Sequence, residues 1–196
     1  MDLQYSSSLN GASFLLFELK QVIKLKKEGL LNTEIRKKVI EDNIFQVANK
    51  NRINRSLPSV MKRADVIDEI LAKHMMEGSL EDSKLINLYA IMKTDLLFFE
   101  FMREVISEKL QNNNLSLEKK DINIFFTVKS EQNEQVRNWS DINIEKLKRA
   151  YMQVLFESGL LKERKSNELT RLLIDDQLKE HLKNIGDSKY LQAMGE

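Results

Sequence analysis

Residues 96–110 read LLFFEFMREVISEKL and form the most apolar stretch of the chain. Coiled as a helix, this stretch would present large apolar side chains over more than half of its circumference. These side chains are Phe98, Phe99, Phe101, Met102, Val105 and Ile106. Several neighbouring elements are needed to cover so many sides, so the stretch predicts the central helix of a multi-helix protein. Charged residues interrupt it well short of the ~20 apolar residues of a membrane-spanning helix, and we expect no membrane segment.

The composition of the 196-residue chain favours a folded, helical protein. A hydrophobic fraction of 42% and a charged fraction of 31% are typical of folded rather than disordered chains. A single Pro and six Gly leave little material for a many-turned β architecture. The absence of Cys excludes disulfides, Cys-ligated metals and thiol nucleophiles. It fits a reducing cytoplasm, where we expect the protein, and residues 1–10 lack the apolar run of a signal peptide.

Apolar residues at three- and four-residue spacing predict further helices on both sides of the central stretch. These helices cover residues 12–28, 33–42, 56–77, 80–93, 117–128 and 141–158. Gly29, Gly78 and Gly159 are placed to end three of them. In the helix predicted to start near Ser56, Pro58 would lie in the first turn, where it is well tolerated. The preceding residues 51–55 (NRINR) then form a polar, basic connection.

The region after Gly159 predicts a small hairpin. Leu160 and Leu161 begin the first of two short apolar arms, which flank a polar, basic tip at residues 163–168. A helix, a Gly-Leu-Leu turn and a hairpin outline a winged helix-turn-helix. The predicted fold class is therefore all-α, with one short β-hairpin. We expect an N-terminal helix-turn-helix-like unit in residues 1–78, a central helical bundle in 79–138 and a C-terminal winged-helix-like unit in 139–196.

The sequence offers no catalytic constellation. Its two histidines, His74 and His181, lie in predicted helices without a second His or acids at ligand spacing. No glycine-rich phosphate loop, nucleophile elbow or zinc-binding motif is present. Adjacent acids such as Asp175 and Asp176 point to different faces of a helix and cannot share one site. We therefore predict a protein that is not an enzyme and that has no metal site and no cofactor.

Positive charge is concentrated between Lys20 and Arg63. This segment holds twelve Lys and Arg against four acidic residues, a net charge of +8, whereas the whole chain carries +1. The remaining residues therefore sum to −7. A positive face on an otherwise acidic body attracts polyanions and orients them on one side of the molecule.

Such charge runs are most often simply solvated helix faces, but three features favour nucleic-acid binding here. The charges come from several predicted helices, they include Arg beside Asn and Ser, and they precede or enter a helix. The residues predicted to contact nucleic acid are Lys37, Lys50, Arg52, Arg55, Lys62 and Arg63. A secondary basic patch is predicted from Lys146, Arg149, Arg164 and Lys165. Contacts of this kind would go mainly to phosphates.

Several motifs occur together in a familiar order. They are Tyr5-Ser6-x-x-Leu9-x-Gly11-x-Ser13-Phe14-Leu15, the basic segment Asn51–Arg63, the Phe-rich segment Leu96–Lys109, Asp121 with Phe125-Phe126, and Trp139-Ser140 leading to Gly159-Leu160-Leu161. In this combination the chain resembles the BrxA family of bacterial BREX (bacteriophage exclusion) defence systems. The likeness runs from about Tyr5 to Leu182.

The resemblance implies an all-helical, cytoplasmic, non-enzymatic protein, likened to the antitermination factor NusB and expected to bind double-stranded DNA. It also implies work beside other BREX components, namely a methyltransferase, a phosphatase-like protein and an ATPase. The family offers no catalytic motif to transfer. Lys50, Arg52, Arg55, Lys62 and Arg63 match the region where the family is basic, whereas Pro58 departs from a continuous helix there. Some family members have been labelled inner-membrane proteins, which this sequence contradicts.

Two alternatives remain open at the level of sequence. An RNA-binding, NusB-like factor would use the same basic surface, although few exposed aromatic residues are predicted for base stacking. A protein–protein adaptor would dock its basic face on an acidic partner subunit of the defence system.

Overall fold

The computed structural model describes residues 4–196, and it confirms the all-α class. The α-helices of the first half are α1 (Leu16–Lys27), α2 (Asn32–Glu41), α3 (Lys50–Asp65), α4 (Glu69–Glu77), α5 (Leu80–Thr94) and α6 (Leu96–Phe101). Those of the second half are α7 (Glu108–Gln111), α8 (Lys119–Gln132), α9 (Glu134–Arg137), α10 (Asp141–Ser158), α11 (Asp176–Asn184) and α12 (Ser188–Ala193). A short 3-10 turn, η1 (Ser8–Asn10), and a π-helical segment, η2 (Met102–Ser107), complete the helical elements.

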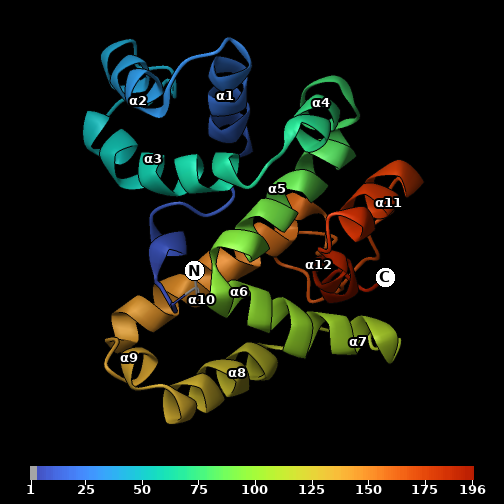
Figure 1. The fold of residues 1–196 in the computed structure, drawn as a ribbon. Coiled ribbons are helices and arrows are strands. Elements are labelled where there is room, and N and C mark those ends of the chain that lie inside the picture. Colours follow the sequence, from blue (N-terminus) through green and yellow to red (C-terminus); the bar gives the residue numbers. More distant parts are fainter. Residues whose placement is uncertain (1–3) are drawn as a thin grey trace.

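The helix α5 lies at the centre of the fold. It contacts α1, α3 and α4 on one side and α6, α10 and α12 on the other. Figure 1 shows α1, α2 and α3 gathered at one end of the molecule, with α8 and α9 at the opposite end. Every residue of α5 from Leu85 to Met92 is buried, which explains why the basic N-terminal helices and the C-terminal elements share one scaffold.

The predicted central helix is present as a continuous α6–η2–α7 segment. Asp95 caps it, because its Oδ1 accepts the N–H of Phe98 at 3.0 Å. The Phe98 ring packs edge-on against Tyr151 of α10, with 4.9 Å between ring centroids. Only its middle part departs from the prediction, since Met102–Ser107 forms a π-helical turn rather than an α-helix.

The third helix begins earlier than predicted. α3 starts at Lys50, where Oδ1 of Asn49 accepts the N–H of Asn51 at 2.9 Å, so Pro58 lies inside the helix rather than in its first turn. A Pro in a helix interior removes one backbone hydrogen bond. Ile53 is fully buried with Leu57 on the inner face, and this packing outweighs the loss.

The predicted helix over 56–77 is in fact two helices. α3 ends at Asp65, and Asp68 starts α4 by accepting the N–H of Leu71 at 2.9 Å. The apolar spacing continues across this break, which is why periodicity alone did not reveal it. The first helix likewise begins at Leu16 rather than near residue 12, after Leu15 adopts a left-handed conformation (φ 51°).

The predicted hairpin after α10 is present, with its arms joined by an isolated β-bridge. Gly159 ends α10 with φ +88°, a left-handed conformation that glycine adopts without strain. Leu161 then bridges Leu169 in antiparallel fashion, and Ser116 bridges Glu168, so a third segment joins the predicted two arms. The pairs remain isolated bridges, which leaves the protein all-α.

Buried apolar residues from Leu9 to Met194 form one contiguous cluster. This cluster draws on all three predicted units, and the division at residues 78 and 138 remains a prediction. Among residues 4–196, no helix is both long and apolar enough to cross a membrane.

Candidate nucleic-acid interface

The α3 helix carries a basic stripe on its outer face. Arg52, Arg55 and Lys62 are exposed, with half-buried Ser59 among them, at a spacing that places all four along one side of the helix. The stripe spans about 15 Å of helix axis at 1.5 Å per residue. The opposite face is buried and packs on α1, α2 and α5, so the stripe faces outward by necessity.

The cations of this stripe have no acidic partner. Among residues 4–196, neither Arg52, Arg55 nor Lys62 forms an ion pair, whereas two α1 lysines do: Lys26 contacts Asp65 at 2.5 Å and Lys27 contacts Glu77 at 3.3 Å. Ion pairs therefore neutralise part of the positive charge on α1, whereas no ion pair neutralises the charge of the α3 stripe. Unpaired cations along one helix leave a positive potential that an anionic partner can neutralise.

Lys37 and Lys50 are also exposed, on α2 and at the first position of α3. Each lies at the same end of the molecule as the stripe, because α2 packs on α3 (Figure 1). Of the six predicted contact residues, five are thus available to a partner in solution.

The structure corrects the prediction for the sixth residue, Arg63. Its side chain is buried, with 2% of the residue exposed. Nη1 donates to the carbonyl of Phe14 at 2.8 Å, and Nη2 donates to the carbonyls of Ser13, at 2.8 Å, and Ala12. Burial lowers the pKa of Arg63 to about 10, so it remains charged at neutral pH. Arg63 fastens the segment before α1 to α3, and its guanidinium is committed to these three carbonyls rather than to solvent.

A polar recess of about 280 Å³ opens beside the stripe. Arg55, Lys62 and Ser59 of α3 line one side, and Ser6 and Ser8 of the N-terminal segment line the other. Arg and Lys commonly bond phosphate oxygens, whereas the hydroxyls of Ser6 and Ser8 already donate to Asp95. Sequence reasoning missed the two serines, because only the fold brings the start of the chain to α3.

A buried carboxylate lies at the base of this recess. Asp95 Oδ2 accepts hydrogen bonds from the hydroxyls of Ser6 and Ser8, at 3.4 and 3.3 Å. Burial raises the pKa of Asp95, while hydrogen bonds from Phe98 and Ser8 and the charge of Arg63 oppose that rise. The Asp95 carboxylate thus has its hydrogen-bond partners inside the protein, and the exposed cations Arg55 and Lys62 remain available to a ligand.

Only two residues of the predicted secondary patch line the same recess. Arg149 of α10 and Arg164 of the hairpin line one recess, which also receives Lys119 of α8. Lys146 and Lys165 are exposed but do not line it. Two of the four residues therefore line the recess, and the patch as a whole remains a prediction.

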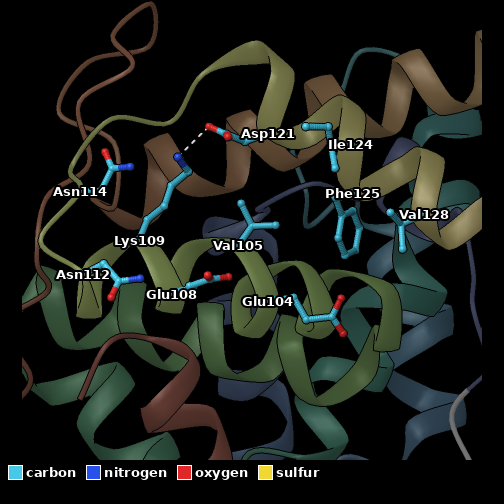
Figure 2. Close-up of a pocket in the computed structure, with 10 residues that line it drawn as sticks. All are labelled: Glu104, Val105, Glu108, Lys109, Asn112, Asn114, Asp121, Ile124, Phe125 and Val128. Atoms are coloured by element: carbon cyan, nitrogen blue, oxygen red, sulfur yellow. Dashed lines mark ion pairs between the residues drawn. The ribbon is translucent and has the colours of Figure 1, made fainter.

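A different recess lies between the η2–α7 segment and α8 (Figure 2). Its volume is about 370 Å³, and its apolar wall includes Ile124 and Val128 of α8. Its one cation, Lys109, is paired with Asp121 at 2.8 Å, while Glu104 and Glu108 add negative charge. This recess is unsuited to a phosphate, so the basic chemistry stays on α3 and on the recess beside α10.

The histidines show no catalytic arrangement. His181 Nε2 lies 2.7 Å from Asp68 Oδ2 and joins α11 to the start of α4, while His74 is half-buried on α4. Within the described range 4–196, no group of three or more potential ligands is placed to hold a metal ion.

Comparison with known proteins identifies the family. The BrxA family model matches residues 3–186, nearly the whole chain. The chain belongs to the BrxA family. Another BrxA protein, "BREX protein BrxA" of Bacillus cereus (strain H3081.97), is 40% identical over 191 residues, which cover 97% of this chain and 96% of the relative. The motif-based prediction of a BREX phage-defence protein of the BrxA family is thereby confirmed.

The BrxA fold also resembles a solved structure. The crystal structure of an uncharacterized protein from Magnetospirillum magneticum superposes with a TM-score of 0.83 over 97% of both chains, at 19% sequence identity. At this identity the likeness extends to the fold alone.

Proposed function

We propose that this BrxA-family protein binds duplex DNA through the α3 stripe, as a non-catalytic accessory component of its BREX system. The observation that carries the proposal is the row of Arg52, Arg55 and Lys62, exposed on one helix face and free of acidic partners among residues 4–196. Binding would be mainly electrostatic, because Lys and Arg contacts to phosphates displace condensed counterions.

The shape of the N-terminal helices supports a duplex as the partner. α3 crosses α1 and α2 and keeps one long face free, as the recognition helix of a helix-turn-helix does (Figure 1). Arg52 lies in the first turn, where base edges are commonly read, while Lys62 lies near the far end. Arg55, with Ser59 beside it, is placed for phosphates on the flank of the groove.

The first experiment is a titration of fluorescent duplex DNA, single-stranded DNA and RNA of one sequence, at two salt concentrations. We expect preferential, salt-sensitive binding of the duplex. The double variant Arg52→Glu with Arg55→Glu should weaken duplex binding by at least about tenfold at moderate salt, irrespective of sequence.

The matched control is Lys73→Glu with Lys183→Glu, which makes the same change in net charge on α4 and α11, away from the stripe. This control should retain most of the affinity. Wild-type affinity in the Arg52/Arg55 variant, with an unchanged far-ultraviolet spectrum, would remove α3 from the proposal. Preference for RNA in direct competition would favour the NusB-like alternative.

One observation favours an adaptor role through a surface other than the basic face. In the recess of Figure 2, Ile124 is 59% exposed and Val128 is 37% exposed, one helical turn apart on α8. Glu104 is paired with Arg103 and Lys129, whereas Glu108 forms no ion pair among residues 4–196. An apolar pair beside Glu108 suits a basic, amphipathic segment of a partner protein. Because α8 lies at the end of the molecule opposite α3, such docking is compatible with DNA on the stripe.

A further inference from the structure

A cationic recess lies between α8, α10 and the hairpin, on another side of the fold from the α3 stripe. Its volume is about 450 Å³, within the usual range of ligand pockets, about 300–1,000 Å³. Main-chain bonds hold its rim: Leu117 N–H donates to the Asn167 carbonyl at 2.7 Å, and Leu169 N–H donates to the Leu115 carbonyl at 2.8 Å. The hairpin is therefore fixed against the segment that leads into α8, and the recess is formed before any ligand arrives.

Four cations line this recess. Lys148 of α10 pairs with Glu145, whereas Lys119 of α8, Arg149 of α10 and Arg164 of the hairpin tip form no ion pair within residues 4–196. Arg149 Nε instead donates to the Glu145 carbonyl at 3.1 Å, which holds the guanidinium along α10. Like charges brought together by tertiary structure repel one another, so an anion bound among them would offset this electrostatic repulsion.

The surroundings of Glu145 show that the cations converge. Lys148 contacts its carboxylate at 2.7 Å. This hydrogen bond is the main reason that the pKa of Glu145 is lowered, and the nearby charges of Lys119 and Arg149 lower it further. One carboxylate therefore lies among three cations from two helices. The other acid of the recess, Glu118, pairs outside it with Lys120 at 2.9 Å, which leaves a positive surplus inside.

The floor of the recess is apolar. Leu117 and Ile122 are buried there, and Met152 of α10 is half-buried beside them. The amides of Gln153 and Asn167 lie at its edge. An apolar floor with cations and amides around it matches a flat base with an attached phosphate, since bases stack on apolar surfaces and Arg forks fit phosphates.

We propose that this recess binds a nucleotide unit, with Arg149 and Arg164 on the phosphate and the base against Ile122 and Met152. The same chemistry is offered by a free nucleotide and by the end or an unpaired base of a nucleic-acid strand. The site is built from α8, the segment that leads into it, α10 and the hairpin, without any residue of α3, so it is independent of the function proposed for α3.

The test measures binding by fluorescence anisotropy with two probes, an N-methylanthraniloyl derivative of ATP and a short 5′-phosphorylated single strand labelled at its 3′ end. We expect saturable binding of at least one probe. Arg149→Glu with Arg164→Glu should weaken that binding by at least about tenfold, whereas Arg52→Glu with Arg55→Glu should leave the ATP probe unaffected. The control is Lys165→Glu, beside Arg164 on the hairpin but outside the recess, and it is matched by Arg164→Glu alone, which makes the same change in net charge.

The two probes distinguish a free nucleotide from the end of a nucleic-acid strand. Saturation with the ATP probe identifies a free nucleotide, and saturation with the strand alone identifies a strand end. No saturation with either probe up to about 1 mM, or equal weakening by Lys165→Glu and by the Arg149/Arg164 variant, would overturn the proposal. Should the double variant lose helical signal, Arg164→Gln on the exposed hairpin tip provides the same comparison with less charge change.

Discussion

Arg63 of α3 donates a hydrogen bond of 2.8 Å to the main-chain carbonyl of Phe14, two residues before α1 begins. The side-chain amide of Asn87, on α5, donates to the same carbonyl at 2.7 Å. Three elements thus meet at one buried oxygen. The most basic helix of the protein is held to its scaffold by one of its own arginines, which leaves the others to face solvent.

Replacing Arg63 should therefore cost stability. Arg63→Met leaves the carbonyls of Ala12 and Ser13 without their arginine donor and Asp95 without a nearby positive charge. We expect the free energy of unfolding to fall by about 3 kcal/mol, measured by urea denaturation. Lys62→Met, one residue earlier and exposed, should stay within about 0.5 kcal/mol of the wild type. Equal midpoints for the two variants would contradict the structural role of Arg63.

Pro58 offers a stabilising change. It lies inside α3, is exposed and has no N–H to donate to the preceding turn. Pro58→Ala should raise the free energy of unfolding by about 2 kcal/mol, because Pro is about 3 kcal/mol worse than Ala in a helix interior and part of that returns through unfolded-state entropy. Thermal and urea unfolding measure the gain. Asn54→Ala, another exposed position of α3, should gain less than about 0.7 kcal/mol, and a loss of stability at Pro58→Ala would show that the Pro fits a bend in α3.

The four tyrosines predict loss of stability at alkaline pH. Burial raises the pKa of Tyr5, Tyr89, Tyr151 and Tyr190, the last to about 12. A raised pKa in the folded state means that the stabilisation is complete below the unfolded value of about 10 and is lost as pH rises through the folded values. We expect phenolate absorbance and loss of helical circular dichroism to appear together above about pH 10. Phenolate absorbance near that pH with unchanged helix content would contradict the burial of these rings.

Salt dependence should report each residue of the stripe separately. If Arg55 and Lys62 each neutralise one phosphate, Arg55→Gln and Lys62→Gln should each reduce the slope of log affinity against log salt by about 0.9. Lys26→Gln provides the comparison, because Lys26 belongs to the same basic segment but is paired with Asp65. An equal change in slope for Lys26→Gln and Arg55→Gln would mean that net charge, rather than the α3 stripe, governs binding.

Local sequence was sufficient for the ends of several helices. Ser79 caps α5 by accepting the N–H of Asp82 at 3.0 Å, and Ser140 caps α10 by accepting the N–H of Asn143 at 3.3 Å. Gly29 and Gly159 both adopt positive φ at helix ends. These features depend on residues within a few positions of one another, so periodicity and capping rules describe them well.

The sequence by itself determined the all-α class, the buried central helix and the concentration of positive charge in residues 20–63, because each follows from composition or short-range spacing. Only the tertiary structure decided which of those charges face solvent. Arg63 and Lys62 are neighbours in sequence, yet one is buried and the other exposed, because successive residues of a helix point about 100° apart. The sequence grouped Arg149 and Arg164 in one predicted patch, whereas Lys119 joins them only in the tertiary structure, since contacts between distant segments are set by how the helices pack.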